Sequence, residues 1–266
     1  MNCAGVGRPV REQPIHCQGH VKELLCADEI HLWLLADDAS LDSCLLEEFR
    51  RLLTEDERRR EHSYRFRKDQ RRYLITRGLV RTVLSRYCQV KPHEWLFTHN
   101  AHGRPAIAND EPAAKEISFN ISHTAGLMVV GVTRCSALGV DAEYIRQRPA
   151  AARLAERFFS SSEVAALRAL PVEQQSRRFV EYWTLKESYI KTCGKGLSMP
   201  LDVCSFSIRD TGMSACVQAQ VADAAVSWEF WLLRPTAAHV VAVCAQGSLG
   251  TSQRVVTTRF VGDLRV

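Results

Sequence analysis

The sequence predicts an α+β protein, because segments typical of strands and of helices are mixed along the whole chain. The strand-like runs are short, apolar and bounded by polar or turn-forming residues. The helix-like segments are longer and repeat their apolar residues with helical spacing. Both kinds occur in each half of the 266-residue chain, which is long enough for one large domain or two smaller ones. We expect two subdomains that meet near residue 136.

Residues 28–136 are expected to form the N-terminal subdomain, in which helical segments lie between strands. The second helical region is the longer one, and we expect it to be broken once. In chain order, the expected elements are a strand at 30–35, helices at 41–53 and 55–87, and strands near 95–97, 117–121 and 127–132.

Residues 137–248 are expected to form the C-terminal subdomain, which shows the same mixture. In chain order, the expected elements are a strand at 138–143, helices at 154–159, 162–170 and 174–192, and strands at 203–208, 226–233 and 240–244. The two ends of the chain carry weaker patterns. We therefore interpret residues 1–27 as a flexible N-terminal extension and residues 249–266 as a C-terminal tail.

The composition is that of an ordinary globular protein, with 46% hydrophobic and 24% charged residues and a net charge of +5. The mild positive excess suits an acidic partner. The ten cysteines form no C-x-x-C pair, and Cys135, Cys204 and Cys244 lie in apolar runs, which favours free buried thiols in a reducing compartment. No stretch approaches the ~20 apolar residues of a membrane helix, and no signal-peptide core is visible. We therefore expect a cytoplasmic protein with no membrane partner.

Two carboxylates stand two residues apart in the apolar segment 139–143, which reads G-V-D-A-E. Because alternate residues of a strand point to the same face, Asp141 and Glu143 are expected side by side. Two hard oxygen ligands of this kind suit Mg²⁺, which completes its shell with water and substrate phosphate. The segment alone also fits a solvated strand end, so it predicts a metal site only with support from elsewhere in the chain.

A carboxylate and a lysine stand four residues apart in the helix-like segment 183–191, which reads W-T-L-K-E-S-Y-I-K. Glu187 and Lys191 are therefore expected one helical turn apart, a spacing that also fits a common surface pair worth ~0.3–0.5 kcal/mol. Glu187 can supply a third metal ligand, and Lys191 can hold a phosphate as a point charge. Together the two segments predict a site for a divalent ion and a phosphate.

Both segments, and several others, resemble the 4′-phosphopantetheinyl transferases of the Sfp type, which activate peptide and polyketide synthases. The family patterns G-[IV]-D-x-E and W-x-x-K-E-[AS]-x-x-K are both met without departure. The order of the matching segments is also that of the family, from about residue 54 to residue 200. The further matches are G-R-P at 103–105, F-N-I-S-H at 119–123, R-F-F-S at 157–160 and G-K-G-L at 194–197.

The resemblance implies a fold and a reaction. The implied fold has two similar subdomains related by pseudo-twofold symmetry, with CoA and the active site in the cleft between them. The implied reaction is Mg²⁺-dependent transfer of 4′-phosphopantetheine from CoA to a serine of an apo acyl or peptidyl carrier protein, which releases 3′,5′-ADP. Asp141, Glu143 and Glu187 would hold Mg²⁺. Lys191 would offset charge on the phosphates, and Glu187 is the candidate general base.

The resemblance also assigns residues to the nucleotide end of CoA. His123 is expected to contact the 3′-phosphate, with Ser122 in the same binding turn. Gly103 and Arg104 are expected near the adenine, where a glycine permits close approach of the backbone.

A basic run interleaved with aromatic residues spans 58–72 and admits more than one interpretation. It fits a nucleic-acid-binding segment, or a solvated helix face. In the family, the corresponding region supplies basic side chains to the 3′-phosphate of CoA, and Arg60 and Arg72 are the candidates here. Acidic residues within and beside the run dilute its charge, so we expect no nucleic-acid partner.

The expected partners are CoA and an apo carrier protein, and the expected state is a monomer. The resemblance places the carrier near residues 148–170, where Arg153, Arg157 and Phe158 are candidate contacts. Two other functions remain open. One is a different Mg²⁺-dependent phosphoryl or nucleotidyl transferase that uses the same carboxylates, and the other is a nucleic-acid-binding module built around the basic run.

Overall fold

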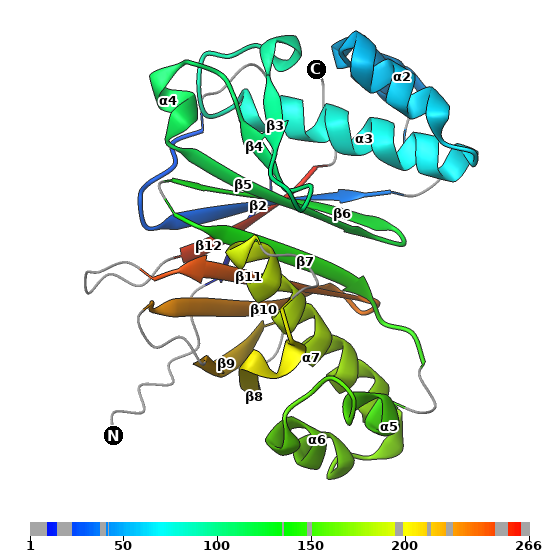
Figure 1. Ribbon diagram of the computed structural model, residues 1–266, viewed down its shortest axis with the longest axis vertical. Coiled ribbons are helices and arrows are strands. Elements are labelled where there is room, and N and C mark those ends of the chain that lie inside the picture. Colours follow the sequence, from blue (N-terminus) through cyan, green and yellow to red (C-terminus); the bar gives the residue numbers. More distant parts are fainter. Residues whose placement is uncertain are drawn as a thin grey trace.

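The computed structural model describes residues 10–14, 23–37, 41, 43–134, 136–147, 151–194, 199–211, 214–221, 226–247 and 255–261. Within these ranges, two five-stranded sheets pack against each other, and helices cover the outer face of each sheet (Figure 1). A two-stranded sheet is appended to the first half. This mixture of strands and helices in both halves confirms the expected α+β class.

The first sheet is built mainly from the N-terminal half. Its strand β2 pairs antiparallel with β6, and β6 pairs antiparallel with β5 at the sheet edge. Helices follow β2 in the chain and cover the outer face of the sheet (Figure 1). The elements are β2 (Glu29–Ala36), α1 (Ser43–Leu52), α2 (Glu55–Ser63), α3 (Arg67–Leu84), η1 (Pro92–Glu94), β3 (Phe97–His99), β4 (Pro105–Ile107), α4 (Pro112–Lys115), β5 (Ile117–Thr124) and β6 (Leu127–Arg134).

The long helical region of this half is broken once, as expected, between α2 and α3. Its start is fixed by a capping box: the Glu57 amide donates to the Thr54 hydroxyl, and the Thr54 amide donates to the Glu57 carboxylate. Tyr64, with ψ at 131°, takes an extended conformation and ends α2. The break lets α2 and α3 follow different directions across the first half (Figure 1).

The second sheet belongs to the C-terminal half. Its edge strand β7 pairs with β11, followed in order by β10, β9 and β8, and α7 lies along its outer face (Figure 1). Strand β9 was not among the expected elements. The elements are β7 (Leu138–Tyr144), α5 (Ala151–Ala155), α6 (Ser161–Arg168), α7 (Val172–Cys193), η3 (Leu201–Val203), β8 (Cys204–Thr211), β9 (Ser214–Val221), β10 (Trp228–Thr236) and β11 (His239–Gln246).

The helix expected at 154–159 lies earlier, at Ala151–Ala155. Beyond it, the amides of Arg157 and Phe158 donate to carbonyls three residues back, which closes a tighter turn than an α-helix. Ser160 then caps α6 through its hydroxyl, which accepts from the Glu163 amide. The apolar residues that had predicted a single helix at 154–159 therefore lie in the end of a short helix and in the tighter turn that precedes the next helix.

Two strands come from the ends of the chain, where the sequence had predicted a flexible extension and a tail. Strands β1 (Val10–Pro14) and β12 (Val255–Phe260) pair in parallel, and β12 pairs in parallel with β2 inside the first sheet. That expectation is wrong at these residues. The register pairs Val255 with Glu29, so the partner strand lies at the opposite end of the sequence. Strand β12 also buries polar side chains, so its pattern does not alternate apolar with polar residues.

Three apolar clusters hold the layers together among the described residues. One lies under α1 and α3, one under α7, and the third joins the facing surfaces of the two sheets. Trp33 and Phe179 are fully buried members of the first and second clusters. Cys204 and Cys244 are buried thiols, as expected, while Cys135 lies outside the described residues.

Both halves arrange their elements in a similar order. Each begins with a strand, continues with helices, and ends with an antiparallel pair whose last strand pairs with the first: β2 with β6, and β7 with β11. This order fits the expected pair of similar subdomains, and the pseudo-twofold axis stays a prediction. Among the described helices, none combines the length and the apolar character that crossing a bilayer requires.

Candidate functional site

Strand β7 and helix α7 lie unusually close together, and a glycine allows it. A Cβ atom on Gly139 would lie 2.1 Å from the Ser188 carbonyl oxygen and 2.3 Å from Thr192 Oγ1. No larger residue fits there without moving the helix away from the strand. The glycine of the G-V-D-A-E segment therefore sets the distance between the two segments that carry the charged groups.

The carboxylates of β7 face the helix, as the strand period predicts. Ala142 and its alternate neighbours join the apolar cluster between the sheets, so Asp141 and Glu143 point to the opposite face. Asp141 is buried, with 6% of its surface exposed. Its Oδ1 accepts a hydrogen bond from Lys191 Nζ at 2.8 Å and one from Ser122 Oγ at 3.0 Å. The structure thus joins Asp141 and Lys191, one residue from each motif.

Lys191 uses its ammonium group to hold the site together. Besides Asp141, Nζ donates to Ser122 Oγ at 2.9 Å and to the Val140 carbonyl at 3.0 Å. The side chain is nevertheless 30% exposed, so it lies at the boundary between the packed interior and solvent. An ammonium group at this boundary can reorient toward an anion that binds from the solvent.

Glu187 lies in the same group of charges and is half-buried. Burial raises its pKa, and repulsion from Asp141 and Glu143 adds to this, while Lys191 acts in the opposite direction. Its Oε1 and the Oδ2 of Asp141 are both buried without a hydrogen-bond partner. Buried polar atoms are almost always paired. Two carboxylates that repel each other and each keep an unpaired oxygen therefore indicate a place for a cation or a hydrogen-bond donor.

Edge strand β5 of the first sheet is tied to β7 by its side chains. The side-chain oxygens of Asn120, Ser122 and Thr124 accept hydrogen bonds from the amides of Val140, Ala142 and Tyr144, at 2.8, 3.0 and 3.0 Å. This ladder crosses from one half of the molecule to the other. It gives the F-N-I-S-H segment a structural role, which its sequence did not reveal.

Ser122 and His123 lie inside strand β5, not in a binding turn as the sequence had predicted, because the strand continues to Thr124. His123 is exposed to solvent on one side and lies within electrostatic reach of Asp141 and Lys191. Partial loss of hydration lowers the pKa of its ring, and the positive charges of Arg72 and Lys191 lower it further. Arg72 is therefore within electrostatic reach of His123, although it also pairs with Asp69 at 2.8 Å. The contacts of both residues with CoA stay predictions.

The other expected CoA residues lie at different places. Arg60 is exposed near the end of α2. Gly103 has a φ of +80° in the turn between β3 and β4, and a Cβ there would meet no atom within 4 Å. Arg104 turns its guanidinium toward the C-terminal half, where it donates to backbone carbonyls of α7 and β7. Within the G-K-G-L segment only Gly194 lies among the described residues.

The described residues contain no group of three His, Cys, Asp or Glu side chains that already converges as a metal site. Lys191 takes up one oxygen of Asp141 instead. The donor set nevertheless suits Mg²⁺, because Asp141 and Glu187 each keep a buried oxygen without a partner. The magnesium site stays a prediction.

One ion pair of the helix motif was missed from the sequence. Lys186 and Glu163 are both fully buried and lie 2.9 Å apart. Lys186 also donates to the carbonyls of Leu201 and Cys204, at 2.8 and 2.5 Å. A lysine inside an apolar helical stripe is a signal for such a pair, because lysine is almost never fully buried alone. The pair fixes α7 against α6 and the start of β8.

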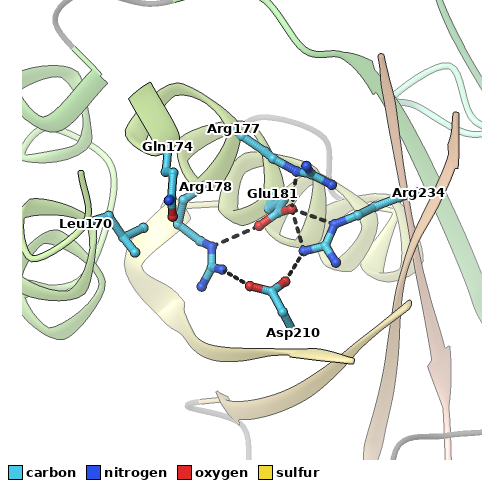
Figure 2. A pocket seen from close by; sticks show the side chains of 7 residues that line it. All are labelled: Leu170, Gln174, Arg177, Arg178, Glu181, Asp210 and Arg234. Carbon is cyan, nitrogen blue, oxygen red and sulfur yellow. Dashed lines mark hydrogen bonds and ion pairs between the residues drawn. The ribbon is translucent and has the colours of Figure 1, made fainter. Parts of the chain in front are cut away.

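A second ionic cluster lies near the start of α7, beside a cavity of about 420 Å³ (Figure 2). Glu181 is 1% exposed and is surrounded by Arg177, Arg178 and Arg234, whose nitrogens lie 3.3, 2.9 and 2.7 Å from its oxygens. Arg178 and Arg234 also hold Asp210 between them (Figure 2). This cluster joins α7 to β8 and β10 and shares no residue with the motif site.

Comparison with known proteins places the chain in a family. Residues 137–244 match a family model described as the 4′-phosphopantetheinyl transferase superfamily, and residues 43–135 match one described as 4′-phosphopantetheinyl transferase, N-terminal. The transferase HetI of Nostoc sp. is 35% identical over 174 residues, 65% of this chain and 72% of that protein. The transferase Sfp of Bacillus subtilis is 35% identical over 163 residues, 61% of this chain and 69% of that protein.

The matched span includes β7 and α7, so the charged site between this strand and this helix belongs to a transferase. The chain belongs to the 4′-phosphopantetheinyl transferase superfamily and is an enzyme of the Sfp type. The resemblance inferred from the sequence motifs is thereby confirmed.

Proposed function

We propose that this enzyme transfers 4′-phosphopantetheine from CoA to a serine of an apo acyl or peptidyl carrier protein and releases 3′,5′-ADP. The observation that supports this most is the pair of buried, unpartnered oxygens of Asp141 and Glu187 beside Lys191. That arrangement suits a cation and a phosphate group together. CoA would lie where the two halves meet, as in the pseudo-symmetric arrangement inferred from the sequence.

Asp141, Glu143 and Glu187 would hold Mg²⁺. When bound, the ion would neutralise charge on the pyrophosphate of CoA and polarise its phosphorus. The pKa of Glu187 lies above its ordinary value because of burial and the neighbouring carboxylates, which makes this carboxylate a stronger base once it is ionised. Its Oε1 would accept the proton of the carrier serine. Lys191 would offset negative charge on the leaving 3′,5′-ADP.

The nucleotide end of CoA would lie beside His123 and Arg72. Partial loss of hydration, Arg72 and Lys191 lower the pKa of His123, so the ring is neutral at pH 7 in the free protein. A phosphate bound there would offset these positive charges and favour the protonated ring, which donates from both nitrogens. Arg60 is a second candidate for the same phosphate, and the turn at Gly103 for the adenine.

The carrier would dock on α5 and the turn that follows it. Arg153 and Arg157 are exposed there, and the Arg157 guanidinium lies 5.5 Å from the centre of the Phe158 ring. The Phe158 ring in turn meets the ring of Trp183, the first residue of the α7 motif, at 5.9 Å. Basic and aromatic side chains of this kind suit an acidic partner with an apolar centre. Residues 148–150 lie outside the described part of the chain.

A nucleic-acid-binding module gains no support from the basic run. Arg59 pairs with Asp56, Arg72 with Asp69, and Arg71 lies 3.4 Å from Asp37. Such pairs offset part of the positive charge that binding to a phosphate backbone requires.

Intact-mass measurement of apo carrier proteins, incubated with CoA, Mg²⁺ and the enzyme, tests the proposal. A mass increase of one phosphopantetheinyl group is expected on at least one acyl or peptidyl carrier. Asp141→Ala should lose roughly 100-fold or more of the rate, because a charged group at the reacting phosphate is removed. Asp110→Ala, at an exposed surface position, is the matched control and should keep full activity. Unchanged turnover by Asp141→Ala would exclude the proposed site.

A further inference from the structure

A single guanidinium from the N-terminal half fastens both segments that carry the site. Arg104 Nη1 donates to the carbonyl of Lys191 at 2.6 Å and to that of Thr192 at 2.8 Å. Its Nη2 donates to the carbonyl of Leu138 at 2.8 Å. Two of these acceptors lie in the last turn of α7, and the third is the first residue of β7.

The C-terminal end of α7 stabilises the positive charge of Arg104. Burial lowers the pKa of Arg104, and its guanidinium donates to the backbone carbonyls of Lys191, Thr192 and Leu138. The last carbonyls of an α-helix have no partner within the helix and carry its negative partial charge, so a cation is stabilised there. Helix α7 ends at Gly194, with φ +67°, whose amide donates to the Ile190 and Lys191 carbonyls. Arg104 adds a second donor to Lys191 and one to Thr192.

The turn that carries Arg104 is built to present it. Asn100 Oδ1 accepts hydrogen bonds from the amides of His102 and Arg104, both at 2.9 Å. Asn100 Nδ2 donates to the carbonyl of Gly194 at 3.2 Å, which joins the same turn to the end of α7. Gly103 supplies the positive φ that lets the chain reverse before Arg104. The loop is therefore ordered by its own side chains before Arg104 reaches across.

We propose that Arg104 is a positioning residue for the transfer reaction: it holds the end of α7 against the start of β7, so that Lys191 stays in place beside Asp141. The sequence had assigned this side chain to the adenine, whereas its guanidinium donates to carbonyls of the other half. The lysine ammonium lies 2.8 Å from Asp141 Oδ1, and both backbone segments behind this contact are held by the same guanidinium. The inference rests on the proposed function for its kinetic consequence.

The kinetic test uses Arg104→Met, Arg104→Lys and Asn100→Ala with CoA and a carrier that the wild type modifies. A shift of about 1 Å at a reacting group can cost roughly 100-fold in rate. Arg104→Met should therefore lower kcat by about that factor, with KM for CoA within about threefold of wild type. Arg104→Lys should recover part of kcat, because it keeps a charge at the helix end but lacks the fork that reaches both segments. Asn100→Ala should give a smaller loss of the same kind.

Arg209→Met, at an exposed arginine of β8, is the matched control and should leave kcat and KM unchanged. A rise in KM for CoA with unchanged kcat in Arg104→Met would overturn the proposal in favour of direct contact with CoA. A lower melting temperature with unchanged kcat at a temperature where the variant is folded would also overturn it, because the residue would then be a structural cap alone.

Hydrogen exchange separates failure of this inference from failure of the proposed function. In Arg104→Met, amide exchange should rise in residues 138–140 and 190–194, while the first turns of α7 keep wild-type protection. If the wild type modifies no carrier, the transfer reaction is excluded, and the exchange pattern still decides whether Arg104 holds the two segments. If Arg104→Met does not fold, Arg104→Lys and Asn100→Ala give the same two readouts. Unchanged exchange in both segments overturns the inference.

Discussion

Helix α7 carries two ionic clusters, and they differ in how completely their charges are paired. Around Glu181, each oxygen of the two carboxylates faces a guanidinium. Around Glu187, six residues further along, Lys191 pairs with one oxygen of Asp141, while Asp141 Oδ2 and Glu187 Oε1 are buried without a partner. Glu181 Oε2 and Arg178 Nε, 2.9 Å apart, also lack hydrogen-bond geometry, so the clusters differ in charge balance. Three arginines face two carboxylates around Glu181, whereas one lysine faces three carboxylates around Glu187.

The difference teaches that an uncompensated excess of negative charge marks a site better than the number of charges or the volume of a cavity does. The cluster around Glu181 has the greater number of charges and adjoins a cavity, yet its arginines offset the charge of both carboxylates (Figure 2). Leaving a buried oxygen without a partner costs about 1–3 kcal/mol, so the cluster around Glu187 is less stable than it could be. A protein that keeps such a cost in its interior has a use for the unpaired atoms.

The same substitution in the two clusters gives the sharpest test of this comparison. Glu187→Gln should lower the transfer rate about 100-fold or more, because the candidate base and one ligand charge are lost, while the protein stays folded. Glu181→Gln should lower the free energy of unfolding by about 1.5–3 kcal/mol, because the half-buried Arg178 and Arg234 keep Asp210 but lose the charge of Glu181. Its transfer rate should stay close to wild type at a temperature where it is folded. Urea unfolding and carrier modification measure the two effects.

The comparison breaks if the two variants behave alike. A large loss of stability in Glu187→Gln would mean that its carboxylate is a structural partner. A large loss of rate in folded Glu181→Gln would bring the arginine cluster into the reaction.

The two lysines of the α7 motif, Lys186 and Lys191, allow the same comparison between a structural ion pair and the candidate site. Lys186→Met should cost about 3 kcal/mol of stability, because it leaves the buried Glu163 without its counter-charge. Adding Glu163→Leu should recover only part of that loss, because the Ser160 and Phe206 amides then lose the carboxylate that accepts their hydrogen bonds. Lys191→Met should cost less stability, about 1.5–3 kcal/mol, and should abolish most of the transfer activity. A double variant no more stable than Lys186→Met would contradict this expectation, because the lost hydrogen bonds of Ser160 and Phe206 would then outweigh the removal of the buried charge.

Much of the fold could be predicted, because most strands carry a local signal. The runs at 30–35, 127–132 and 138–143 form β2, β6 and β7. Each run either consists mainly of consecutive apolar residues or alternates apolar residues with other residues. Strand β12 gives no such signal. Its Thr257, Thr258 and Arg259 are buried, and its partner β2 lies near the other end of the chain. The position of such a strand is set by its long-range pairing with the sheet and not by an alternating pattern in its own residues.

The site could be predicted in its residues but not in its connections. The motifs named Asp141, Glu187 and Lys191, and the structure brings them together. Neither motif indicated that Gly139 sets the spacing of β7 and α7, or that Arg104 reaches across to both. These contacts join residues far apart in the sequence, and a spacing rule within one segment contains no information about them.

The smallest expected effect is a difference in sign between the pH dependences of the stability that Glu187 and Asp210 contribute. It is measured with a chelator present, so that no metal is bound. Burial, Asp141 and Glu143 raise the pKa of Glu187, so the folded protein binds that proton more tightly than the unfolded chain does. Its contribution to stability should fall as pH rises above about 4.3 and through the raised pKa. Burial opposes ionisation of Asp210, but Arg234 and Arg178 outweigh it and lower its pKa.

Asp210 should therefore add stability above about pH 3.9 and lose that contribution as pH falls through its lowered pKa. Urea unfolding between pH 3 and 7 gives both slopes when wild type is compared with Glu187→Gln and with Asp210→Asn. The advantage of Glu187→Gln over wild type should grow with rising pH, and the deficit of Asp210→Asn should shrink with falling pH. Two slopes of the same sign would mean that the carboxylates of both clusters are equally well paired, which would remove the physical distinction between the site and the network.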